Sequence, residues 1–223
     1  MLQSTIEIAR EAGQIVREGF DHVGHVAYKG SVNPVTETDR TAEAHIIARL
    51  RDIFPESLIL GEESGGSSWR TSQPIWLVDP LDGTNNFAHG FPHFCVSIGL
   101  MIEGEVSIGV IYDPLREEMF AARRGGGATL NGVSIRVSQI TKLASALLAT
   151  GFSYTRRVTA DNNTRTLDYF LRRSQGVRRA GSAALDMAYV ACGRLEGFWE
   201  LHLNPWDLAA GVLLAQEAGG QVS

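Results

Sequence analysis

Cysteine and long apolar runs are scarce in this sequence of 223 residues. The two cysteines, Cys95 and Cys192, lie far apart in apolar surroundings, which favours buried thiols over a disulfide or a zinc site. No apolar run approaches the length of a membrane span, and Glu7 and Arg10 interrupt the N-terminal segment where a signal peptide has its apolar centre. We therefore expect a cytoplasmic protein that does not contact a membrane.

Positive charge is also limited, because the formal net charge is -5. A general nucleic-acid binder needs a positive surface, so this charge argues against nucleic acid as a partner. Lysine occurs only at positions 29 and 142, whereas seven arginines lie between Arg156 and Arg179. We interpret this arginine-rich segment as a solvated face or part of a subunit interface, with anion binding as the alternative. A homodimer is the expected assembly.

The spacing of apolar residues changes character along the chain. Up to about residue 142 it predicts two amphipathic helices followed by mainly antiparallel strands, and beyond that point strands alternate with helices. This pattern predicts an α+β subdomain over residues 1–142 and an α/β subdomain over residues 143–223, packed as a layered sandwich. The expected elements are helices over 3–20, 38–54, 160–174, 182–193 and 205–220, and strands over 57–64, 74–80, 146–152 and 195–201, with three or four antiparallel strands between 94 and 132.

Acidic residues gather where the predicted elements begin or end. Each one alone has a simple structural explanation, either a favourable interaction with a helix dipole or a solvated turn. Together, at a shared edge of an α/β layer, they would repel one another unless a cation lay among them. Carboxylates without a cluster of cysteine or histidine favour Mg²⁺, Mn²⁺ or Ca²⁺ over zinc. The residues concerned are Asp39, Glu62, Glu63, Asp79, Asp82 and Asp207.

Gly83 and Thr84 directly follow the aspartates of the segment "VDPLDGT". A glycine before a helix start offers free backbone N–H groups that can bind phosphate, and the Thr84 hydroxyl could orient or deprotonate an attacking water. Carboxylate-held ions beside such a turn predict a two-metal site for phosphoryl transfer. Haloacid-dehalogenase-type phosphatases instead have D-x-D-G-T, but the extra residue in D-P-L-D-G-T displaces Asp79 from the nucleophile position of that motif.

Five segments of the chain occur in the order and spacing of one known family: "GEES", "WLVDPLDGTNNF", "GVIYDP", "GSAALDMAYVACG" and "PWDLAAGVLLAQEAGG". Together they resemble the inositol monophosphatase family in its bacterial form, over the whole chain. The resemblance implies the fold shared by inositol monophosphatase and fructose-1,6-bisphosphatase. Family members usually continue beyond "EAGGQV" with a further strand and helical elements, so we expect the second subdomain to be shortened at its C-terminus.

The same resemblance implies a role for individual residues. It implies two or three Mg²⁺ ions, with Mn²⁺ as a substitute and Ca²⁺ or Li⁺ as inhibitors. Thr84, supported by Asp39 and by Glu62, would activate the attacking water, and Lys29 would approach the site from a loop. The implied metal ligands are Glu62, Asp79, the backbone carbonyl of Leu81, Asp82 and Asp207. The implied substrate contacts are Gly83, Thr84, Gly181, Ser182, Ala183, Glu200 and Asp207.

The function that follows is Mg²⁺-dependent hydrolysis of inositol monophosphate or a similar small polyol phosphate. Related phosphatases act on fructose-1,6-bisphosphate, histidinol phosphate or a nucleotide 3'-phosphate, and these remain alternatives. Glu200 favours the first choice, because a carboxylate suits neutral hydroxyls and repels a second phosphate. An alternative of another class is a regulatory partner of RNA or protein in which catalysis is secondary.

Overall fold

A mixed eight-stranded sheet forms the centre of the computed structural model, which describes residues 1–21, 26–28, 34–66 and 72–223. The strand order is β10-β9-β8-β7-β6-β5-β3-β4, and only the β3–β5 pair is parallel. The antiparallel strands expected between residues 94 and 132 are confirmed. The strands are β3 (Leu58–Gly61), β4 (Gly65–Gly66), β5 (Ile75–Asp82), β6 (Cys95–Ile102), β7 (Glu105–Asp113), β8 (Glu118–Arg123), β9 (Ala128–Leu130) and β10 (Val133–Ser134).

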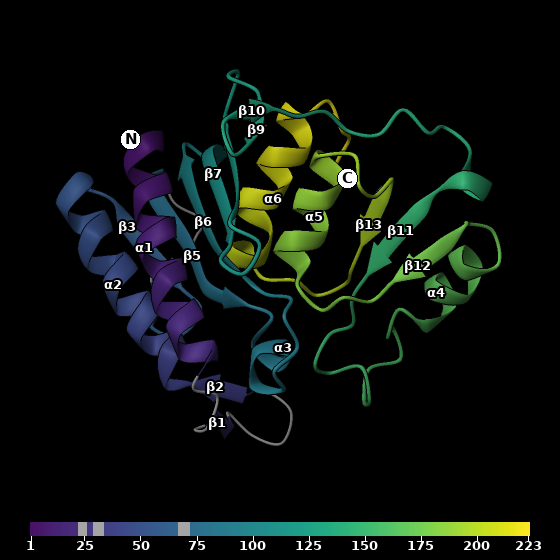
Figure 1. Ribbon diagram of the computed structural model, residues 1–223, viewed down its shortest axis with the longest axis horizontal. Helices are drawn as coiled ribbons and strands as arrows, with labels where there is room; N and C mark the ends of the chain where they lie inside the picture. The colour runs from purple at the N-terminus through teal and green to yellow at the C-terminus, as the bar shows by residue number, and fades with distance from the viewer. Residues whose placement is uncertain (22–25, 29–33, 67–71) are drawn as a thin grey trace.

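Helices cover both faces of this sheet (Figure 1). The amphipathic helices α1 (Leu2–Phe20) and α2 (Glu37–Ile53) pack on one face, and α5 (Ala183–Ala191) and α6 (Pro205–Glu217) pack on the other. Because the central strands are buried on both sides, their sequences are almost continuously apolar rather than alternating. The four helices confirm the helical spacing found in the sequence.

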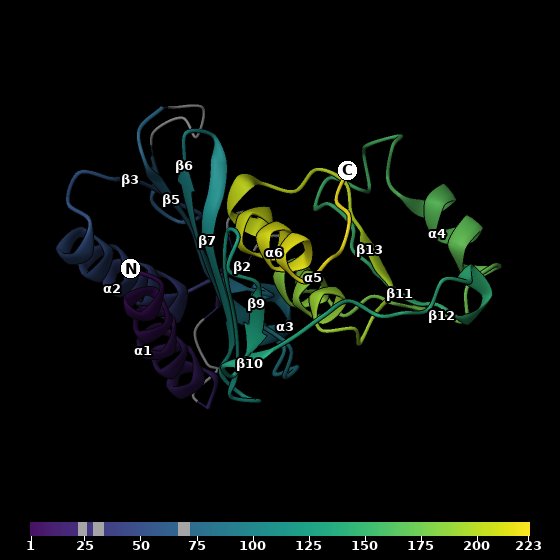
Figure 2. The same cartoon turned by 90° about the horizontal axis from the view of Figure 1, so that it is seen from above.

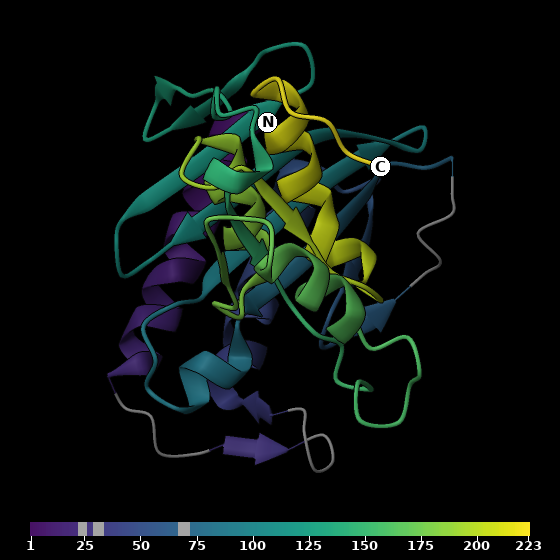
Figure 3. The ribbon, with the colours of Figure 1, turned by 90° about the vertical axis from the view of Figure 1, so that its right-hand side faces the viewer.

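A second, smaller sheet lies beyond α5 and α6 (Figure 2). Its three strands are all parallel, in the order β12 (Gly176–Arg178), β11 (Leu147–Thr150) and β13 (Gly197–Trp199). Helix α4 (Thr164–Leu171) packs beside β12 and lies in front of the small sheet in Figure 3. The layers therefore run helices, sheet, helices, sheet, helix, which confirms the expected layered sandwich.

The remaining described elements are short. Strands β1 (Val26–Tyr28) and β2 (Pro34–Thr36) form an antiparallel pair, α3 (Thr84–Ala88) follows β5, and the 3₁₀ turn η1 (Leu143–Ser145) lies at the boundary expected near residue 142. Strand β12 was not predicted, and α4 is shorter than the helix predicted over 160–174. No helix within the described ranges is both long enough and apolar enough to cross a membrane.

Candidate active site

The end of strand β5 forms the base of a pocket between the two sheets. Pro80 lacks an N–H group, and the pairing of β5 with β6 shifts between Asp79 and Asp82, as in a β-bulge. The Asp79 carboxylate stabilises the irregular turn, because Oδ1 accepts a hydrogen bond from the N–H of Leu81 at 3.0 Å. Both aspartates consequently line the pocket, together with Leu81.

Glu62 reaches the same pocket from the neighbouring strand. Strands β3 and β5 run parallel with Gly61 opposite Val78, so the next residues, Glu62 after the end of β3 and Asp79 within β5, lie side by side. The N–H of Glu62 still donates to the Val78 carbonyl, at 3.1 Å. The register of one parallel pair therefore brings together two carboxylates that are seventeen positions apart in the sequence.

Asp82 is held by the start of helix α5. Its Oδ2 accepts hydrogen bonds from the Ser182 hydroxyl at 2.7 Å and from the Ala184 N–H at 2.6 Å. Ser182 is buried and is also the N-cap of α5, accepting a bond from the N–H of Leu185. The large sheet and the start of α5 are thus joined at a carboxylate of the pocket.

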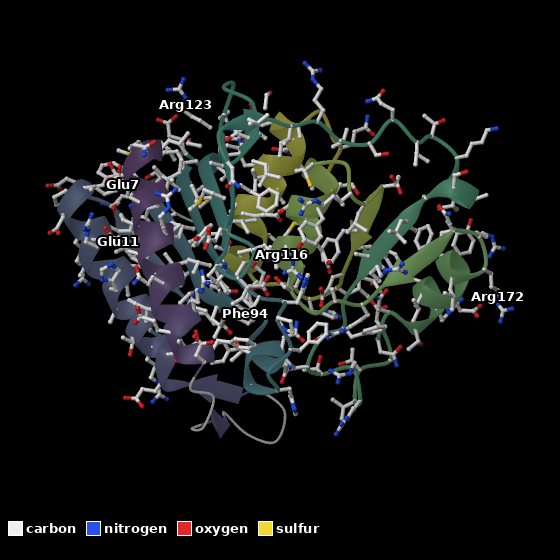
Figure 4. The ribbon with its side chains drawn as sticks, viewed as in Figure 1. Glu7, Glu11, Phe94, Arg116, Arg123 and Arg172 are labelled. Carbon is white, nitrogen blue, oxygen red and sulfur yellow. The ribbon has the colours of Figure 1, made fainter. Side chains whose placement is uncertain are left out.

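Gly83 and Thr84 make the turn from β5 into α3. Gly83 has a φ of 105°, and a Cβ at this position would lie 2.9 Å from the carbonyl oxygen of His93, so both conformation and space require glycine. The Thr84 hydroxyl donates to the carbonyl of Leu81 at 3.0 Å. The first N–H groups of a helix have no partner within it, and they are available here beside the carboxylates. Phe94, labelled in Figure 4, packs against the ring of Phe87 in this short helix.

Asp207 enters the pocket from the first turn of α6. Pro205 begins the helix, and the N–H of Asn204 donates to Oδ2 of Asp207 at 2.7 Å. This bond fixes the side chain at the helix start, where a carboxylate also interacts favourably with the helix dipole. The interaction with the helix dipole and the expected role as a metal ligand are therefore compatible in Asp207.

Glu200 reaches the pocket from the end of the small sheet. Strands β11 and β13 run parallel with Thr150 opposite Trp199, so Gly151 and Glu200 follow side by side. A Cβ at Gly151 would collide with the Glu200 carboxylate, and glycine is required for this close approach.

A buried network around Asn163 fixes the end of these two strands. The Asn163 side chain donates to the Thr150 hydroxyl and the Gly151 carbonyl, both at 2.8 Å, and accepts from the Trp199 indole N–H at 2.7 Å. Asn163 has a φ of 67°, a left-handed conformation that asparagine tolerates better than most residues. All three bonds of the side chain therefore hold the strand ends from which Gly151 and Glu200 project.

Replacing Asn163 with alanine is expected to destabilise the fold by about 2 to 3 kcal/mol, because it leaves buried donors and acceptors unpaired. The matched control is Asn131→Ala, since Asn131 also has a positive φ but lies exposed in a hairpin. Chemical unfolding measures the stability, and KM for the substrate reports the position of Glu200. An equal effect of both variants on KM would contradict a positioning role of Asn163.

The carboxylates of the pocket strongly affect one another. Burial raises the pKa of Asp79 well above its usual range, and the charges of Glu62, Asp82 and Asp207 raise it further. Burial also raises the pKa of Asp82, and that of Asp207 to about 8. Burial and mutual repulsion therefore favour the protonated forms of these groups, and a bound cation would favour the ionised forms.

These residues fit a hard divalent cation in their chemistry. Every donor is an oxygen, from four carboxylates and the Leu81 carbonyl, whose second lone pair is not used by Thr84. Within the described ranges, no three Asp, Glu, His or Cys side chains already stand in a coordination geometry. Hydrogen bonds from the protein occupy one oxygen each of Asp79, Asp82 and Asp207, which leaves the second oxygen of each for a ligand.

The pocket brings together most of the residues that the sequence singled out. Asp39 and Ser182 are buried behind its wall, although the charge of Asp39 acts on Asp79. Lys29 lies outside the described residues. The singled-out residues that line the pocket are Glu62, Asp79, Leu81, Asp82, Gly83, Thr84, Gly181, Ala183, Glu200 and Asp207. Lining residues that sequence reasoning missed are Asn85, Gly151, Phe152, Tyr154, Arg179, Asp186, Leu203 and Asn204.

The arginine-rich segment divides into two parts in the structure. Arg179 lines the pocket, whereas the other arginines between 156 and 178 do not. Arg172 lies at the far end of the molecule from α1 (Figure 4) and pairs with Asp168 at 2.8 Å. Most of the segment is therefore a solvated face, and one arginine is part of the site.

Comparison with known proteins identifies the family. The profile of the inositol monophosphatase family matches residues 1–223. The inositol-1-monophosphatase of Synechocystis sp. is 47% identical over 227 residues, covering 100% of this chain and 79% of that protein. The Nus factor SuhB of Escherichia coli is 44% identical over 225 residues, covering 100% of this chain and 84% of that protein. The solved structure of inositol monophosphatase from Anabaena sp. superposes with a TM-score of 0.88 at 45% identity, covering 99% of this chain and 83% of that one.

The chain belongs to the inositol monophosphatase family, and it is a phosphatase with the fold of that family. The resemblance found in the sequence motifs is confirmed. The family is generally metal-dependent, which agrees with the oxygen-rich donor set of the pocket.

Proposed function

We propose that this protein is a Mg²⁺-dependent phosphomonoesterase that hydrolyses inositol monophosphate or a similar small polyol phosphate. The observation that supports this most directly is the convergence of four carboxylates, from the ends of β3 and β5 and the start of α6, on the Gly83–Thr84 turn. Oxygen ligands beside free helix N–H groups suit metal-assisted attack of water on a phosphate ester.

The proposed metal ligands are Glu62, Asp79, the carbonyl of Leu81, Asp82 and Asp207, with two or three Mg²⁺ ions. When bound, Mg²⁺ neutralises charge on the phosphoryl oxygens and makes a bound water more acidic. Mn²⁺ is proposed as a substitute. Ca²⁺ and Li⁺, which also prefer oxygen ligands, are proposed as inhibitors that compete for the same positions.

The chain's own residues position the water and the ester. Because the Thr84 hydroxyl donates to Leu81, its oxygen lone pairs can accept a hydrogen bond from the attacking water. Asp39 supports this pair through its charge, and the N–H groups of Gly83 and Thr84 bind the phosphate. Gly181 and Ala183 then contact the substrate from the start of α5, and Glu200 contacts it from the end of β13.

A panel of phosphate esters tests this proposal. Phosphate release is measured for inositol 1-phosphate, glycerol 2-phosphate, fructose 1,6-bisphosphate, histidinol phosphate and a nucleoside 3'-phosphate, each with Mg²⁺ and with EDTA. We expect Mg²⁺-dependent release, fastest with inositol 1-phosphate. A clear preference for the bisphosphate or the nucleotide would instead select one of the related phosphatases, and no Mg²⁺ dependence would reject the metal assignment.

A second function is proposed from the similarity to the Nus factor SuhB, namely a regulatory role as an RNA- or protein-binding partner. The exposed arginines between 157 and 178 provide a basic face outside the pocket. A filter-binding titration with RNA at several salt concentrations tests it, because each neutralised phosphate steepens the salt dependence. A homodimer in the cytoplasm remains our proposal for assembly and location.

Mg²⁺ is expected to raise the melting temperature, and more at about pH 8 than at about pH 5. The folded-state pKa of Asp207 is about 8, far above its ordinary value. Without metal, the folded state therefore binds more protons than the unfolded state at any pH between these two pKa values. Metal-free stability therefore falls as the pH rises from about 4 to about 8. At the higher pH, Mg²⁺ at about a hundredfold excess over Kd adds about 2.7 kcal/mol, or roughly 5 to 10 °C.

Thermal unfolding in EDTA and in MgCl₂ measures this effect, and KCl at equal ionic strength is the control. At about pH 5, protons compete with Mg²⁺ for the carboxylates and reduce the shift. An equal shift at both pH values, or an equal shift with KCl, would show that the carboxylates do not share a metal site.

A further inference from the structure

Asp186 is a buried carboxylate that the proposed metal site does not use. It lies on α5 three residues after Ala183, so both side chains face the same side of the helix, and both line the pocket. The residue is only 2% exposed. Within the part of the chain that the structure describes, its carboxylate takes part in no hydrogen bond or ion pair. Because Asp186 lines the pocket, a bound ligand could supply a hydrogen-bond partner for this carboxylate.

Two charged neighbours define the chemistry of that ligand. Burial, together with the negative charge of Asp82, raises the pKa of Asp186 to about 8 and that of Glu200 to about 7, and the guanidinium of Arg179 opposes both shifts. Arg179 also lies close to Gly181, on the same wall of the pocket. Asp186, Glu200 and Arg179 therefore present two carboxylates and one guanidinium to whatever is bound in the pocket.

Only some substrate groups are compatible with this combination. A second phosphate would be repelled by Asp186 and Glu200 in their ionised forms, and an ammonium group could pair with these two carboxylates but not with Arg179. A hydroxyl group is neutral, donates its hydrogen to a carboxylate and accepts from a guanidinium. A ring with several hydroxyls can satisfy all three side chains at once.

We infer that Asp186 is a specificity-determining residue that accepts a hydrogen bond from a ring hydroxyl of a cyclic polyol phosphate, at a position different from the hydroxyl that contacts Glu200. The inference rests on the proposed phosphomonoesterase function and narrows its substrate to polyhydroxylated rings. A site built to bind a hydroxyl rejects an analogue that lacks it, because its own buried groups then stay unpaired.

The variant Asp186→Ala tests the inference with two substrates in the presence of Mg²⁺. We expect kcat/KM for inositol 1-phosphate to fall about tenfold to a hundredfold, while that for 4-nitrophenyl phosphate, which has no hydroxyls, changes less than about threefold. Asp186→Asn retains one acceptor oxygen and is expected to restore part of the loss. Asp168→Ala, which removes an exposed charge on α4, is the matched control and is expected to leave both values unchanged.

Mono-deoxy inositol 1-phosphates make the test more specific. For the isomer that lacks the hydroxyl bound by Asp186, wild type and Asp186→Ala are expected to have equal kcat/KM. Equal losses with inositol 1-phosphate and 4-nitrophenyl phosphate, or no loss with either, would overturn the inference but not the proposed function. If wild type released phosphate from no ester, the proposed function would fail, and this inference would fail with it.

Discussion

Replacing Asp82 with asparagine is expected to lower kcat by about 10³-fold or more while leaving the fold intact. The asparagine Oδ1 can replace Oδ2 of Asp82 and accept the same bonds from the Ser182 hydroxyl and the Ala184 N–H. Its NH₂ group then points to the side where the carboxylate would hold a cation, and it carries no negative charge. The proposed metal site therefore loses a ligand without loss of packing.

Two measurements separate this explanation from simple unfolding. The metal-free variant is expected to unfold at the wild-type denaturant concentration or above it, because burial already disfavours the charged form of Asp82. Its melting temperature is expected to respond little to Mg²⁺. Ser182→Ala is the matched control, since it removes one bond to the same carboxylate but keeps the charge, and we expect less than about a tenfold loss. Turnover near the wild-type rate in Asp82→Asn at saturating Mg²⁺ would reject the metal assignment.

Local signals in the sequence predicted the elements that form the base of the site. The apolar run of β5 ends in "DPLDGT", where proline, aspartate and glycine each disfavour a continued strand. Asn204 and Pro205 mark the start of α6, which places Asp207 in its first turn. The end of β5 and the start of α6 each depend on residues within one turn of each other, so the sequence alone was sufficient to predict both boundaries.

The pairing register of the strands could not be predicted from the sequence. Glu62 meets Asp79 only because β3 and β5 pair in parallel, and Gly151 meets Glu200 only because β11 and β13 do. Such pairings join distant segments, and a shift of one residue would turn the side chains to the other face. Strand β12 was missed because three residues are too few to show a period of two.

Asp186 and Arg179 were missed for a different reason. Asp186 belongs to no turn or strand end, and Arg179, although it directly follows β12, is one of seven arginines in a largely solvated segment. A signal for Asp186 did exist, since it is the one charged residue in the otherwise apolar helix "AALDMAYVA". A lone carboxylate in a run that must be buried is itself an indication of a ligand or a partner.

Thr84→Ala is expected to lower kcat by about 10² to 10³-fold while changing the affinity for Mg²⁺ by less than about threefold. The Thr84 side chain is buried beside the carboxylates, and its hydroxyl donates to the carbonyl of Leu81. In our proposal the same oxygen accepts a hydrogen bond from the attacking water, so its loss affects the reaction rather than the metal ligands.

Thr84→Ser is the matched control, because serine keeps the hydroxyl and removes only a methyl group. We expect it to retain most of the wild-type kcat, whereas alanine does not. Single-turnover kinetics measure the hydrolytic step, and the Mg²⁺ dependence of the melting temperature measures metal affinity in the same variants. If alanine weakened Mg²⁺ binding as much as it slowed hydrolysis, Thr84 would act by holding the Leu81 carbonyl in place. If serine were as slow as alanine, the methyl group and its packing would be the important feature, and the hydroxyl would have no role in activating water.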